Sequence, residues 1–152
     1  MSIPIAISGT DLIGQARTGT GKTLAFGVSA LQRIVLPGDE GWTQSGSRLP
    51  QALVMCPTRE LALQVSRDID TAARVRGARV LTVYGGVGYD SQIDALQRGV
   101  DVVVGTPGRL LDLVGRRDLN LTSCSIVVLD EADEMLDLGF LPDVEKLLGH
   151  CP

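Results

Sequence analysis

Ala16-Arg17-Thr18-Gly19-Thr20-Gly21-Lys22-Thr23 is the stretch that decides the fold of this 152-residue chain. It follows a short apolar run at residues 11–15 and precedes a helical pattern at residues 24–34. Strand, glycine-rich loop and helix are the context of the phosphate-binding pattern G-x-x-x-x-G-K-[S/T], although an alanine stands at the first glycine. The two inner glycines let successive backbone N–H groups turn into one concavity, and the helix N-terminus adds its dipole. The stretch therefore predicts a P-loop.

The last two residues of this stretch carry its chemistry. Lys22 offers a point charge to the β- and γ-phosphates of a nucleotide, and the Thr23 hydroxyl is a ligand for Mg²⁺. The alternative is an ordinary Gly/Thr turn with a capping threonine, which leaves the Lys-Thr pair without a purpose at that spacing. We interpret all eight residues as a nucleotide site: Ala16, Arg17, Thr18, Gly19, Thr20, Gly21, Lys22 and Thr23.

Composition limits the other possibilities. A net charge of −4 excludes a wholly basic nucleic-acid-binding surface but leaves room for local contacts. The apolar runs fall far below the roughly 20 residues of a membrane helix, and we see no secretory leader, so we expect no membrane association. Three cysteines without metal-type spacing indicate unbridged thiols of a reducing compartment, so we predict a cytoplasmic location. The only histidine, His150, gives little basis for histidine chemistry.

Apolar runs alternate with helical patterns along the chain, which predicts an α/β fold. Strands are predicted at 12–15, 52–55, 80–84, 100–104 and 126–129, and helices at 24–34, 61–75, 91–98, from 107, 134–138 and 143–148. The strands lack polar alternation, so we expect a mainly parallel sheet with helices on both faces. Residues 1–152 should form one domain, and residues 37–50, rich in Gly, Ser and Pro, a long flexible surface loop.

Distinctive motifs follow each predicted strand. Ligands of open α/β sheets bind at the carboxyl ends of the strands, so we expect these motifs to share one edge of the molecule. They are Ala16–Thr23, Pro57–Glu60, Gly85-Gly86, Thr106–Arg109 and Asp130–Asp133.

An acidic pair, Asp130-Glu131, follows the last predicted strand. Beside a P-loop, the first acid is suited to hold Mg²⁺ and the second to orient an attacking water. Alternation along the strand should point the two side chains in different directions. The alternative is an acidic turn that caps the following helix.

Two further motifs place helix N-termini at the same edge. Pro57–Glu60 and Thr106–Arg109 each offer N–H groups and an arginine, which suits a phosphate backbone. Gly85-Gly86 allows close approach of a ligand. The alternative is that each is an ordinary cap or turn. The arginines at 74, 76, 79, 116 and 117 are interpreted as solvated surface charges.

The motif series ARTGTGKT, PTREL, GG, TPGR and DEAD resembles, in order and spacing, that of the DEAD-box RNA helicases. Alanine is usual in that family at position 16. The resemblance implies the N-terminal RecA-like domain of a P-loop NTPase that uses ATP and Mg²⁺. It implies catalytic roles for Lys22 and Glu131, metal ligation by Thr23 and Asp130, and coupling through Asp133. RNA would lie along Pro57, Thr58, Arg59, Glu60, Gly85, Gly86, Thr106, Pro107, Gly108 and Arg109.

Other family features are absent from this sequence. They are the upstream adenine-reading glutamine, the Ser-Ala-Thr coupling motif and the second RecA-like domain with its arginine fingers. We therefore expect a fragment of a larger ATP-dependent RNA helicase, inactive alone, whose partners are RNA and that second domain. The coupling strand should lie between the strands at 12–15 and 126–129. The competing functions are a P-loop ATPase acting on DNA or a protein, and a non-catalytic nucleotide- or RNA-binding module.

Overall fold

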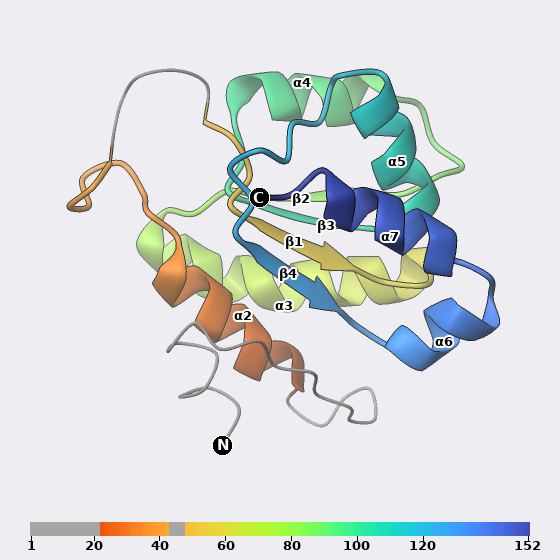
Figure 1. Ribbon diagram of the computed structural model, residues 1–152. Helices are drawn as coiled ribbons and strands as arrows, with labels where there is room; N and C mark the ends of the chain where they lie inside the picture. Colours follow the sequence, from red (N-terminus) through yellow and green to blue (C-terminus); the bar gives the residue numbers. More distant parts are fainter. Residues whose placement is uncertain (1–21, 43–47) are drawn as a thin grey trace.

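The computed structural model describes residues 22–42 and 48–152 as an α/β fold (Figure 1). The predicted strand at 12–15 and the loop residues 16–21 lie outside the described residues, and so does the predicted spacing between that strand and residues 126–129. The elements in chain order are α2 (Lys22–Arg33), β1 (Ala52–Met55), α3 (Arg59–Arg76), β2 (Val80–Val83), α4 (Asp90–Arg98), β3 (Val102–Gly105), α5 (Pro107–Gly115), β4 (Ile126–Leu129), α6 (Ala132–Asp137) and α7 (Leu141–Gly149).

The sheet is parallel throughout its described part, with strand order β2-β3-β1-β4. This confirms the expected parallel sheet, and β1 and β4 have the predicted bounds. Among the described residues β4 pairs only with β1, and its side chains are partly exposed. β1 and β3, which are paired on both sides, are buried along their whole length.

Helices cover both faces of the sheet, as predicted. Alternate strand residues such as Val54 and Val104 pack with residues of α2 and α3. The intervening residues, such as Leu53 and Val103, pack with residues of α4, α5 and α7. Figure 1 shows α2 and α3 on one side of the strands and α4, α5 and α7 on the other. Because both faces are covered, the strands can be continuous aliphatic runs.

The ends of α3 follow from local sequence signals. The Thr58 hydroxyl accepts the N–H of Leu61 at 3.2 Å, which caps the first turn. Gly77 ends the helix in the left-handed conformation, with φ 75°, as its position predicts. Thr106 occupies the same capping position before α5 and Pro107 is the first helical residue, but the Thr106 side chain makes no capping hydrogen bond.

Two arginines interpreted as solvated charges instead link elements. Arg76 donates to the Ile34 carbonyl at the end of α2 at 3.4 Å and pairs with Asp39 at 2.6 Å. Arg79 donates to the carbonyl of Arg98 at 2.9 Å. The sequence alone did not reveal these contacts, because the carbonyl groups come close to the two guanidinium groups only when the chain folds.

Candidate functional site

The strand ends are level with one another, which brings the described motifs to one edge of the sheet. Met55 is the register partner of both Gly105 and Leu129. The ladder of hydrogen bonds continues one residue beyond each of three strands, up to or into the motif that follows. Cys56 donates to Gly105, Thr106 to Val83 and Asp130 to Met55, at 2.9, 3.1 and 2.9 Å. The predicted clustering is confirmed for the motifs at 57–60, 85–86, 106–109 and 130–133.

Of the predicted P-loop, only Lys22 and Thr23 lie within the described residues. The backbone of Lys22 and Thr23 begins α2. In Figure 1 this end of α2 lies on the side to which the strand arrows point, the side of the other motifs. The predicted nucleotide ligands at 16–21 lie outside the described residues.

The acidic motif places its first two carboxylates in different environments. Asp130 is 3% exposed, whereas Glu131 is half-buried. Strand alternation does not cause this difference, because β4 ends at Leu129 and Glu131 adopts the left-handed conformation with φ 54° and ψ 52°. Such a conformation is unfavourable for a residue with a Cβ and is concentrated at functional sites.

The alternative role of this motif as a helix cap has little support. Glu131 occupies the capping position of α6, but its side chain makes no capping hydrogen bond.

The buried Asp130 carboxylate fits Mg²⁺, because this ion takes one or two carboxylates and fills its other positions with phosphate and water oxygens. No cluster of three or more metal-binding side chains occurs within residues 22–42 and 48–152.

Pro57–Glu60 presents the N-terminus of α3 at this edge. The Thr58 hydroxyl uses a lone pair on the Leu61 N–H, so its own proton is still able to bind an acceptor. Arg59 is exposed and lies over the Tyr84 ring at 4.7 Å. That contact joins this motif to the residue before the glycine pair.

Glycines leave open space at the same edge. Gly85, Gly86 and Gly108 are exposed, and a Cβ added at any of them would meet nothing within 4 Å. Gly86 has φ 82°, which explains that glycine by backbone conformation. At Gly85 and Gly108, neither the backbone conformation nor a neighbouring atom among the described residues requires a glycine. The absence of a side chain at these two positions would instead let a ligand approach the backbone closely.

Arg109 is only 9% exposed, and its guanidinium binds protein groups. It donates to the Gln92 side-chain oxygen at 3.1 Å and to the Val87 carbonyl at 2.9 Å. Its Cζ atom lies 4.2 Å from the centre of the Tyr89 ring. Sequence reasoning did not select Gln92 or Tyr89. Gln92 lies four residues before Leu96 on the buried face of α4, so helical periodicity was an available signal.

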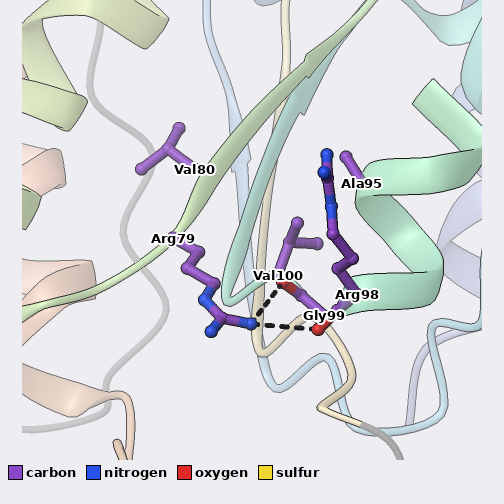
Figure 2. A pocket seen from close by; sticks show the side chains of 6 residues that line it. All are labelled: Arg79, Val80, Ala95, Arg98, Gly99 and Val100. Carbon is purple, nitrogen blue, oxygen red and sulfur yellow. Dashed lines mark hydrogen bonds between the residues drawn. The ribbon is translucent and has the colours of Figure 1, made fainter. Parts of the chain in front are cut away.

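A cavity of about 460 Å³ lies away from this edge (Figure 2). Its lining includes Arg79, the residue before β2, and Val100, two residues before β3, so the cavity lies at the amino ends of the strands. Figure 2 shows the Arg79 guanidinium directed at the carbonyls of Arg98 and Gly99. The cavity therefore contains none of the motif residues.

A protein-family comparison matches the model described as DEAD/DEAH box helicase over residues 1–152. The chain belongs to the DEAD/DEAH box helicase family. This membership confirms the resemblance inferred from the motif series.

Individual relatives agree with the family. The chain is 44% identical, over its whole length, to the ATP-dependent RNA helicase RhlB of Haemophilus influenzae and covers 36% of that protein. It is 47% identical over 99% of its length to the DEAD-box ATP-dependent RNA helicase CshA of Streptococcus pneumoniae, of which it covers 27%. The chain thus spans about a third of the length of these relatives.

A solved structure supports the RecA-like fold. The crystal structure of a hypothetical ATP-dependent RNA helicase from Sulfolobus tokodaii superposes with a TM-score of 0.83 and 38% identity. The match covers 98% of this chain and 40% of the other. Within the residues described here, no helix of this family member has the length and apolar character to cross a membrane.

Proposed function

We propose that this chain is the nucleotide-binding part of an ATP-dependent RNA helicase. The observation that carries the proposal is the level alignment of strand ends, which brings an acidic pair and two helix N-termini to one edge. Relatives named as ATP-dependent RNA helicases cover the whole chain at 44% and 47% identity. We also propose that residues 1–152 form an incomplete helicase domain, with residues 37–50 as a loop within it.

The nucleotide side of the proposed site combines the P-loop with the acidic motif. Residues 16–23 would cradle the phosphates of ATP, with Lys22 supplying the positive charge. Thr23 and Asp130 would hold Mg²⁺, which would neutralise charge on the phosphates. Glu131 would accept a hydrogen bond from the attacking water, and its half-exposed position leaves it accessible to that water.

The RNA side would bind phosphates through helix N-termini. The first N–H groups of α3 and α5 have no acceptor within their own helices, and the helix dipole favours an anion there. The exposed residues Arg59, Gly85 and Gly108 would meet the backbone of the RNA. Such contacts do not read bases, so RNA affinity should vary little with sequence and fall as salt rises.

Coupling and partners complete the proposal. The exposed Asp133 would connect the nucleotide site with the RNA-coupling segment, and a second RecA-like domain would supply arginine fingers. None of the described cysteines is in a disulfide, which fits the predicted cytoplasmic location. An ATPase acting on DNA is the second candidate, favoured only by the fact that backbone contacts alone do not exclude DNA.

Two variants of the full-length protein test the nucleotide half. Lys22→Ala should abolish binding of Mg·ATP because it removes the cradle's cation. Glu131→Gln should retain ATP affinity and lose RNA-stimulated hydrolysis, because an amide keeps the shape but cannot draw a proton from water. A matched control is Glu145→Gln on α7, which is exposed and should hydrolyse ATP like the wild type.

The same assays contain the results that would contradict the proposal. Unchanged ATP affinity in Lys22→Ala would remove the P-loop assignment. Normal turnover in Glu131→Gln would show that another group positions the water. Equal stimulation of hydrolysis by DNA and RNA of the same length would favour the second candidate.

A further inference from the structure

The loop 85–88, which follows β2, is poorly suited to hold its own shape. Three of its four residues are glycines, and all four are exposed. Glycine loses more conformational freedom on ordering than any other residue. Contacts from outside the loop must therefore select the conformation that meets a ligand.

Arg109 and Gln92 supply those contacts. Arg109 binds the Val87 carbonyl in the middle of the loop at 2.9 Å. The amide of Gln92 bridges two groups: its nitrogen donates to the Tyr84 carbonyl at 3.3 Å, and its oxygen accepts from Arg109 at 3.1 Å. Gln92 is 4% exposed and its bond with Arg109 is buried, whereas its bond to the Tyr84 carbonyl is partly buried.

One face of α5 holds the far end of the loop through Tyr89. The Tyr89 ring lies 4.2 Å from the Cζ atoms of both Arg109 and Arg116. Its hydroxyl donates to the Asp112 carboxylate, which raises the pKa of that hydroxyl. Residues 109, 112 and 116 are spaced by three and four along the helix, so they share one face.

From these contacts we infer that Arg109 and Gln92 are positioning residues for RNA binding, which fix the loop 85–88 against α5. The inference rests on the proposed RNA-binding function. It assigns the buried guanidinium to holding the loop, while the exposed glycines and helix N-termini meet the RNA. A bidentate guanidinium is needed for this role, because a lysine ammonium has no fork to reach Gln92 and Val87 together.

The test measures binding of a fluorescent single-stranded RNA to the full-length protein over a series of salt concentrations. Gln92→Leu removes the bridge and keeps an apolar fill, and Arg109→Lys keeps the charge and loses the fork. Each should weaken RNA binding about tenfold, as expected for lost hydrogen bonds to a charged group. The double variant Gln92→Leu/Arg109→Lys should be little weaker than either single variant, because both act through one bridge.

Two readouts separate positioning from other roles. The slope of log affinity against log salt should be almost unchanged in Arg109→Gln, because loss of one phosphate contact on a single strand would change it by about 0.7. ATP affinity without RNA should be nearly unchanged in Arg109→Lys. The matched control is Gln97→Leu, on the exposed side of α4, which should bind RNA like the wild type.

Distinct outcomes would overturn the inference. Wild-type RNA affinity in Gln92→Leu and Arg109→Lys, with a slope lower by about 0.7 in Arg109→Gln, would make Arg109 a direct phosphate ligand. If Gln92→Leu and Arg109→Lys weakened ATP binding as much as RNA binding, both residues would have a general structural role instead of a role in positioning the loop. Absence of RNA binding by the wild type would instead refute the proposed function itself.

Discussion

Gly108→Ala separates the needs of folding from those of RNA binding. Gly108 is the second residue of α5, is exposed, and has space around it: an added Cβ would meet nothing within 4 Å. Its φ is not in the left-handed region, so alanine fits the backbone. Replacing glycine by alanine at such a site should raise the free energy of unfolding by about 0.4–1 kcal/mol, because the unfolded chain loses freedom.

The same methyl group should hinder RNA. In the proposed function a phosphate oxygen approaches the first N–H groups of α5, at a donor–acceptor distance of about 2.9 Å. A Cβ beside that contact should push the phosphate away and weaken RNA binding at least about tenfold, or about 1.4 kcal/mol. The variant would then be more stable and less able to bind RNA.

The assays are urea unfolding and fluorescence anisotropy with single-stranded RNA, both on the full-length protein. Gly115→Ala is the matched control: it ends the same helix, also has open space, and lies at the opposite end from the motif edge. It should leave RNA affinity unchanged. RNA affinity in Gly108→Ala equal to that of the wild type would refute close approach at α5, and a loss of stability would refute the reasoning from open space.

Three further substitutions test the packing. Gly105→Ala should lower the free energy of unfolding by about 1–3 kcal/mol in urea titrations, because the added Cβ would lie 2.7 Å from the Val83 carbonyl oxygen. An unchanged free energy of unfolding would refute the tight contact between Gly105 and Val83. Asp101→Asn should lower the free energy of unfolding by about 3 kcal/mol, because the fully buried carboxylate accepts bonds from Arg48 at 2.8 and 2.6 Å; a loss below about 0.5 kcal/mol would contradict this. Burial raises the pKa of the Cys124 thiol from 9.0 to about 12, so the unfolded chain ionises first as pH rises. The free energy of unfolding should then fall as pH rises from 9 toward 12, by up to about 1.4 kcal/mol per pH unit. Cys124→Ala should remove this thiol's contribution to the pH dependence, which measurement of the unfolding free energy at several pH values would show.

The sequence predicted the elements well because their signals are local. The β1 run is wholly aliphatic and ends at a proline motif, and Gly77 stops α3 where the backbone turns left-handed. The shared edge was also predictable, since parallel strands and short connections bring their carboxyl ends together. The strand register confirms that prediction for the described strands.

The contacts of single side chains were not predictable in the same way. Arg109 was expected to face phosphate, yet its guanidinium lies on a glutamine and a carbonyl from the loop after β2. That loop follows β2, the neighbour of the strand β3 that precedes α5, and the sequence does not show that Gln92 of α4 meets Arg109 of α5. The left-handed backbone of Glu131 was likewise hidden, because its sequence neighbours suggested a continuing strand.

The backbone of Glu131 bears on how this chain can evolve. A left-handed conformation disfavours a residue with a Cβ by roughly 1–2 kcal/mol, and glycine or asparagine relieves much of it. Selection for stability alone would therefore favour glycine or asparagine at position 131, whereas most other residues would keep the same backbone cost. A glutamate that persists at this position across descendants of the gene would mark selection for chemistry acting against selection for stability, and libraries screened only for thermal tolerance should lose it first.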